Sequence, residues 1–121
     1  MTLAHLRPDD VKKVVTISAP LGGSRAALYL KYFARGLHVI GDITPVSPCI
    51  LALQNKSPCP VLSIVSTGGH LPTTSEPNDS VVTVRSQNAI TEAKKVEVNA
   101  NHFEVLNHMR TVEAISKFIN G

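Results

Sequence analysis

Three short runs of β-branched and aliphatic residues constrain the fold of this sequence more than any other feature. Residues 14–17 (VVTI) and 61–65 (VLSIV) have the pattern of buried strands, and residues 94–100 (KKVEVNA) alternate as a third strand should. Segments with helical patterns lie between these runs. Strands that alternate with helices predict a parallel sheet with helices on its faces. The expected fold class is therefore α/β, a three-layer, mostly parallel sheet with flanking helices.

The helical segments are predicted from capping residues and from the spacing of apolar residues. We expect the end of a helix within residues 1–10, a helix over 24–36, a short helix around 50–53, a short helix or turn within 81–90, and a final helix over about 103–118. The final helix is expected to place six apolar residues on one face: Val105, Leu106, Met109, Val112, Ile115 and Ile119. No linker or internal repeat divides the chain, so residues 1–121 are expected to form a single domain.

The composition excludes several classes of protein. Hydrophobic residues make up 43% of the chain and charged residues 17%, as in a packed domain rather than a disordered one. No apolar run approaches the ~18 residues that span a bilayer, and no signal peptide is visible. Localisation stays open: the chain as given would stay in the cytoplasm, whereas an intact relative with a leader would be exported. The net charge is +3, but the lysines and arginines lie on separate segments and only five aromatic residues are present. This distribution argues against nucleic-acid binding.

The two cysteines, Cys49 and Cys59, allow two interpretations. Free thiols are the default where no secretion signal exists, and a disulfide is conceivable if the protein is exported. Neither cysteine has a second Cys or His at the spacing of metal ligands, so no metal site is predicted.

Asp79 and His102 are the candidate catalytic residues. In parallel sheets, chemistry gathers in the loops that follow the C-terminal ends of the strands. Asp79 lies in the polar loop after the second predicted strand, and His102 directly follows the third. An imidazole acts as a general base when a carboxylate fixes its tautomer and stabilises its charged form, and neighbouring strands roughly 5 Å apart can bring the two together. The same residues also fit an ordinary turn and a helix cap, so both interpretations stay open.

Three segments, taken together, resemble the lipases and esterases of the α/β-hydrolase superfamily. Residues 14–27 (VVTISAPLGGSRAA) are similar to the family's hydrophobic strand followed by P-x-x-G-S, and residues 77–87 (PNDSVVTVRSQ) to the N-D-G-x-V-x-x-x-S segment of the triad acid. Residues 99–119 (NANHFEVLNHMRTVEAISKFI) resemble the segment of the active histidine and the last helix. The acid precedes the histidine, as in the family.

The resemblance implies a partial α/β-hydrolase fold, its C-terminal half, in which Asp79 is the triad acid and His102 the triad base. Pro20, Gly22 and Ser24 take a loop role only. The implied function is that of a serine-hydrolase-related protein, lipase- or carboxylesterase-like, whose intact relatives act on acyl esters or lipids. The implied chemistry requires no cofactor.

The nucleophile of such an enzyme is missing from this sequence. No G-x-S-x-G occurs in the 121 residues; Ser24 follows the wrong strand, and Ser66 (VSTGG) lacks the preceding glycine. We therefore expect that the chain alone does not hydrolyse esters. The alternative is a truncated, non-catalytic α/β module that oligomerises or binds a hydrophobic ligand. An unpaired strand edge over residues 11–18 and uncovered apolar faces predict a homo-oligomer.

Other titratable residues are weaker candidates. His108 is the alternative base, although it is expected within the final helix, and Glu76 is the reserve acid if Asp79 faces away. His70 lies near the predicted acid, where it could contact a substrate or only solvent. His5 and His38 have no motif around them.

Overall fold

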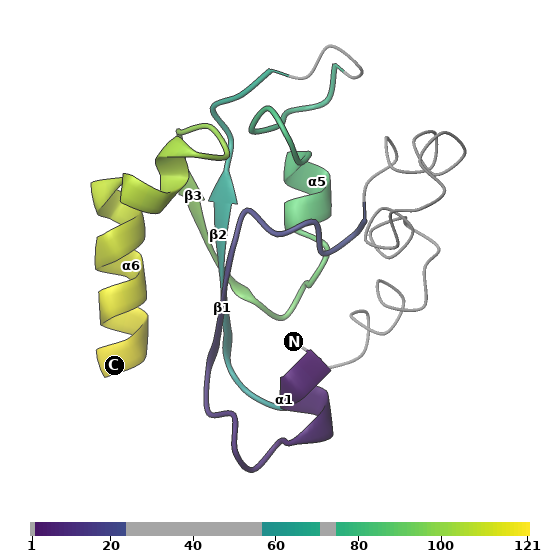
Figure 1. Cartoon of the computed structure of the whole chain (residues 1–121), viewed down its shortest axis with the longest axis vertical. Coiled ribbons are helices and arrows are strands. Elements are labelled where there is room, and N and C mark those ends of the chain that lie inside the picture. Colours follow the sequence, from purple (N-terminus) through teal and green to yellow (C-terminus); the bar gives the residue numbers. More distant parts are fainter. Residues whose placement is uncertain (1, 24–56, 71–74) are drawn as a thin grey trace, which may run out of the picture.

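The computed structural model describes residues 2–23, 57–70 and 75–121, with side chains from Ala4 onward (Figure 1). In chain order the elements are α1 (Thr2–Leu6), β1 (Val14–Ile17), β2 (Val61–Ser66), α5 (Val84–Gln87), β3 (Lys94–Val98), the 3₁₀ helix η1 (Glu104–Asn107) and α6 (Met109–Asn120). The helices predicted over 24–36 and around 50–53 lie outside the described residues, as do Ser24, His38 and Cys49. Cys59 carries a free thiol.

The three strands form one parallel sheet in the order β1-β2-β3. Val14 to Ile17 lie opposite Val61 to Ile64, and Leu62 to Ser66 lie opposite Lys94 to Val98. Every residue of the central strand β2 is buried. The predicted α/β class and the parallel sheet are confirmed. Because the strands are parallel, all three carboxyl ends meet at one edge of the sheet.

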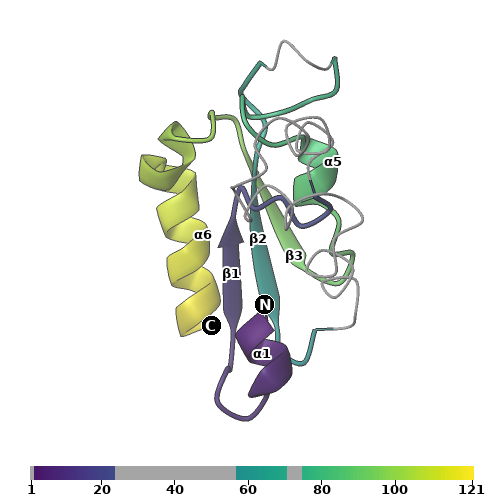
Figure 2. The same ribbon diagram turned by 45° about the vertical axis from the view of Figure 1, so that its right-hand side comes forward.

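Helices lie on both faces of this sheet, with α6 on one side and α5 on the other (Figure 2). Leu62 and Ile64 of β2 point to the α6 side, where they pack with Val98 and Val105 and with the partly buried Ile115 and Phe118. Val61 points to the opposite side, in a second cluster with Leu21, Ile90 and Ala93. Since alternate residues of a strand face opposite ways, one strand supplies both cores. Each buried Leu or Ile stabilises the fold by about 1.5–3 kcal/mol.

The final helix differs from its prediction as a continuous element over about 103–118. Residues Glu104–Asn107 form a 3₁₀ turn, and the chain then breaks at His108, whose backbone is extended (φ −74°, ψ 132°). The His108 side chain caps α6 by accepting a hydrogen bond from the Arg110 amide, with Nδ1 3.2 Å from the nitrogen. The prediction that His108 lies inside the helix is therefore wrong, because the residue ends one helical segment and caps the next.

The predicted apolar face was also wrong in part. Val105 is buried and Ile115 is partly buried. Four of the six predicted residues are more than half exposed: Leu106, Met109, Val112 and Ile119. The break at His108 resets the helical phase, so a spacing counted across it no longer describes one face. The side of α6 that faces the sheet carries Thr111, Ala114, Ile115 and Phe118 instead.

No helix among the described residues is long and apolar enough to cross a bilayer.

Candidate active site: an aspartate–histidine pair

The loop after β2 holds the Asp79 carboxylate in place. Oδ1 of Asp79 accepts hydrogen bonds from the amides of Val81 (3.0 Å) and Val82 (2.7 Å), and the Asp79 amide donates to the Val82 carbonyl at 3.1 Å. An aspartate that bonds amides two and three residues onward closes its own turn. The carboxyl side chain is 0% exposed, and the local backbone holds one of its two oxygens.

Two backbone features shape this loop. Ser80 has a φ of +83°, in the left-handed region that favours glycine. A left-handed conformation costs roughly 1–2 kcal/mol in a residue with a Cβ atom. Gly69 lies against the loop so closely that a Cβ there would stand 2.0 Å from the Asp79 carbonyl carbon. Only a glycine at position 69 lets the two backbone segments approach this closely.

His102 meets Asp79 through its backbone and its side chain. The His102 amide donates to the Asp79 carbonyl at 2.8 Å, and Nδ1 of the ring lies 2.8 Å from Oδ2 of the carboxylate. An ionised carboxylate only accepts hydrogen bonds, so Nδ1 carries the hydrogen and Nε2 of the neutral ring is the basic nitrogen. The side chain is 28% exposed, and no described residue bonds Nε2. The ring packs edge to face with Phe103, with 5.7 Å between the ring centres.

The turn after β3 sets the position of His102. Oδ1 of Asn101 accepts the amides of Phe103 and Glu104, both at 2.9 Å, while a Glu104 carboxylate oxygen lies 3.4 Å from the Asn101 amide. This reciprocal arrangement resembles a capping box centred on Asn101, in the turn that precedes η1, and it satisfies the amides of Phe103 and Glu104. The histidine therefore lies between the end of a strand and a well-defined helix start.

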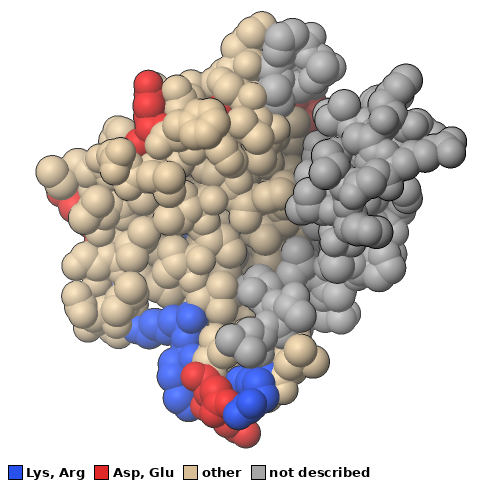
Figure 3. Space-filling view, viewed as in Figure 1, with Lys and Arg blue, Asp and Glu red and all other residues tan. Residues whose placement is uncertain are grey.

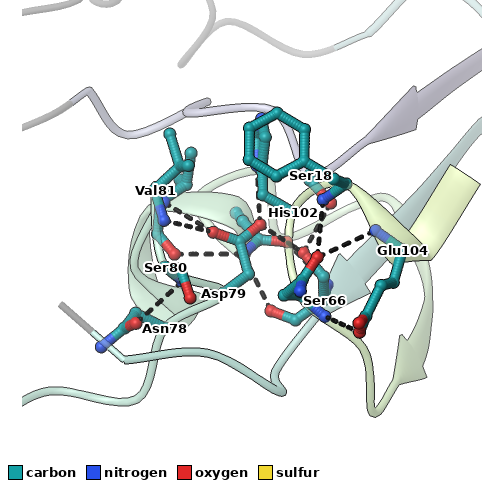
Figure 4. A network of polar contacts seen from close by, with 12 residues as sticks. Ser18, Ser66, Asn78, Asp79, Ser80, Val81, His102 and Glu104 are labelled. Carbon is teal, nitrogen blue, oxygen red and sulfur yellow. Dashed lines mark hydrogen bonds and ion pairs between the residues drawn. The ribbon is translucent and has the colours of Figure 1, made fainter.

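Two buried serines, Ser66 and Ser18, extend the site next to the carboxylate (Figure 4), and a buried glutamine bonds Ser66. The Ser66 hydroxyl, at the end of β2, donates to Oδ2 of Asp79, and the Ser18 hydroxyl, just after β1, lies 2.5 Å from that of Ser66. The Gln87 side chain accepts from the Ser66 amide at 2.8 Å and donates to the Ser66 carbonyl at 3.0 Å. Gln87 belongs to α5, which begins after the N-cap Thr83.

The environment favours an ionised Asp79. Burial raises the pKa of the Asp79 carboxyl, but the hydrogen bonds from Ser66, the Val82 amide, His102 and the Val81 amide outweigh it. The pKa of Asp79 therefore lies below its usual value. At neutral pH the carboxylate is charged and stabilises a positive charge on the neighbouring imidazole.

Sequence reasoning named Asp79 and His102, and the structure brings these two together. Glu76 instead forms an ion pair with Arg85 at 3.3 Å, and His108 caps α6. The His70 amide donates to the Ser80 hydroxyl at 3.1 Å. Ser18 and Gln87 were not predicted from the sequence, and Ser66 was considered only as a poor candidate for the nucleophile. The position of both serines at the carboxyl ends of strands was the available signal.

No group of three or more His, Cys, Asp or Glu that could hold a metal ion occurs in the described part of the chain.

Comparisons with protein-family models, with curated proteins and with solved structures gave no match for this chain.

Proposed function

We propose that this chain supplies the acid and the base of a Ser–His–Asp triad in a lipase- or esterase-type serine hydrolase with an α/β-hydrolase fold. Asp79 is the acid and His102 the base. One observation carries the proposal. A fully buried carboxylate, held by three other hydrogen-bond donors, binds Nδ1 of a partly exposed imidazole across the ends of neighbouring parallel strands.

The geometry suits general acid–base catalysis of acyl transfer. As a serine Oγ bonds to the ester carbonyl carbon, Nε2 of His102 takes the hydroxyl proton, and the carbonyl π electrons move onto its oxygen. When the tetrahedral intermediate collapses, the same proton passes from Nε2 to the departing alkoxide oxygen. Water then repeats the two steps and releases the acid. Asp79 stays ionised throughout and stabilises the imidazolium.

Neither serine of the site fits the role of nucleophile. Ser66 and Ser18 are fully buried, and Ser66 bonds the carboxylate on the Nδ1 side of the imidazole. The nucleophile has to approach Nε2, and the sequence contains no G-x-S-x-G. The proposal therefore assigns the nucleophile, together with the oxyanion-hole donors, to polypeptide outside these 121 residues.

The test compares the chain alone with the chain joined to any polypeptide encoded in frame upstream of it. Alone, the purified chain should neither react with a fluorophosphonate probe nor hydrolyse p-nitrophenyl butyrate faster than free imidazole at equal concentration. The joined protein should contain a G-x-S-x-G, react with the probe at that serine and hydrolyse the ester. His102→Ala should lower kcat at least 10³-fold, while His108→Ala, the matched control, should leave it unchanged. An upstream sequence without a serine elbow, or activity that survives His102→Ala, would overturn the proposal.

A second candidate function is a non-catalytic module that assembles with copies of itself. Exposed large apolar side chains favour it: Phe103, Leu106, Met109, Val112 and Ile119, all in or next to η1 and α6. On the face seen in Figure 3, the surface over these elements is mostly uncharged, with acidic side chains at its margin, whereas basic and acidic side chains gather at the end near α1. The outer edge of β1 has no strand partner among the described residues. Apolar patches and open strand edges both promote association.

A further inference from the structure

The Ser66 hydroxyl lies in the site, although the triad chemistry does not require it. The residue ends β2, is fully buried, and donates to Oδ2 of Asp79, the same oxygen that accepts the hydrogen bond from His102. We infer that Ser66 is a positioning residue that orients the Asp79 carboxylate toward His102, and that Ser18 fixes the direction of the Ser66 hydroxyl. This inference rests on the proposed function, in which His102 acts as the base.

The number of hydroxyl hydrogens fixes the donor and the acceptor in each hydrogen bond among Ser18, Ser66 and Asp79. A hydroxyl group has one hydrogen to donate, and the ionised Asp79 can only accept. The hydrogen of Ser66 therefore goes to Asp79, and Ser18 is the donor in the contact of 2.5 Å between the two hydroxyl oxygens. The side-chain oxygen of Gln87, 3.3 Å from the Ser66 hydroxyl, is the weaker acceptor because it is neutral and already bonds the Ser66 amide.

The backbone at Ser18 explains how a residue of the neighbouring strand reaches this position. Its φ is +50°, in the left-handed region that residues with a Cβ atom seldom adopt. Its amide donates to the Ile64 carbonyl at 2.9 Å, which holds the end of β1 against β2. A strained backbone conformation persists where surrounding contacts over-determine it. Here those contacts direct the Ser18 hydroxyl at Ser66.

Together the donors leave the carboxylate little freedom to rotate. The Val81 and Val82 amides hold Oδ1, while Ser66 and His102 share Oδ2. Without the Ser66 hydroxyl, His102 is the one remaining donor to Oδ2 among the described residues, and only the two amides at Oδ1 hold the carboxylate independently of the imidazole. The hydrogen bond from Ser66 is also one of the interactions that lower the pKa of Asp79.

The experiment compares Ser66→Ala with Ser63→Ala in the full chain. Ser63 lies on the same strand, is also buried, and donates to the main-chain carbonyl of Gln87 at 3.4 Å, with no hydrogen bond to Asp79. Two NMR signals are followed: the ¹³C resonance of the Asp79 carboxyl during an acid titration, and the Nδ1–H proton of His102. Ser66→Ala should move the Asp79 midpoint to higher pH and shift the Nδ1–H resonance. Ser63→Ala should change neither signal.

Further variants keep the inference testable if Ser66→Ala does not fold. Ser66→Cys retains a weaker donor of similar size and should move both signals in the same direction by a smaller amount. Ser18→Ala should move them less than Ser66→Ala, because Ser66 can still donate to Asp79. Signals in the Ser66 and Ser18 variants that match those of wild type would overturn the inference. The NMR measurements need no turnover, so they test the role of Ser66 even if the chain is not part of a hydrolase. The hydrolase proposal is tested by the search for the nucleophile.

Discussion

Asp79→Asn removes one charge from the centre of the site and changes few atoms. In the wild-type chain four donors bond the carboxylate: two amides, the Ser66 hydroxyl and the His102 ring. A hydrogen bond to a charged group contributes about 1.5–3 kcal/mol, and a bond between neutral groups about 0.5–1.5 kcal/mol. If each of the four bonds loses up to about 1 kcal/mol, the variant should be less stable at pH 7 by about 2–4 kcal/mol.

The pH dependence of this difference in stability is a more specific test. Asp79 has a folded-state pKa below its usual value of 3.8, so ionisation of the folded protein is favoured relative to the unfolded chain. The resulting stabilisation is fully present above the unfolded pKa and is lost as pH falls through the folded pKa. Asparagine does not titrate. The stability difference between the two proteins should therefore be larger above about pH 4 than below it.

Urea denaturation followed by circular dichroism at pH 7 and at pH 3 measures this difference. The other acidic residues are common to both proteins, so their contributions cancel in the comparison. A difference of equal size at both pH values would refute the reasoning, because it would mean that the loss is one of packing and not of charge.

Three further predictions follow from single features of the structure. Ser80→Gly should raise the free energy of unfolding by about 0.5–1 kcal/mol, because relief of the left-handed φ outweighs loss of the exposed bond to the His70 amide; a lower urea midpoint would contradict this. Gly69→Ala should destabilise the chain by about 3 kcal/mol or prevent folding, because its Cβ overlaps the Asp79 backbone, and a urea midpoint equal to wild type would exclude that overlap. Phe103→Ser combined with Met109→Ser should shift the chain from oligomer to monomer in sedimentation velocity at micromolar concentration; a monomeric wild-type chain would count against the exposed patch as an interface.

The parts of the fold that could be predicted follow from short-range patterns. The β-branched run at residues 14–17 and the apolar run at 61–65 became β1 and β2, because residues buried on both faces of a sheet leave a continuous apolar signal. The parallel order followed from the intervening segments. The approach of Asp79 to His102 followed in turn, because the carboxyl ends of parallel strands meet at one edge.

The parts that could not be predicted depend on contacts between distant residues. His108 is extended and caps α6. Histidine is not among the residues that commonly cap helices, so the helix-forming residues around it give no sign of this break. Nor does a serine at a strand end reveal its partner. The contact between Ser18 and Ser66 requires both the pairing of β1 with β2 and an unusual backbone angle at Ser18. Neither is encoded in local sequence preference.

The main-chain bond from the His102 amide to the Asp79 carbonyl has a consequence for motion in the site. If the imidazole swings away from the carboxylate, this bond still tethers its Cα atom to the acid loop. The ring then returns by a side-chain rotation, which takes picoseconds to nanoseconds, and no slower search by two independent loops is needed. Fast recovery of the hydrogen bond is thus secured by the backbone and not by the strength of the ion pair.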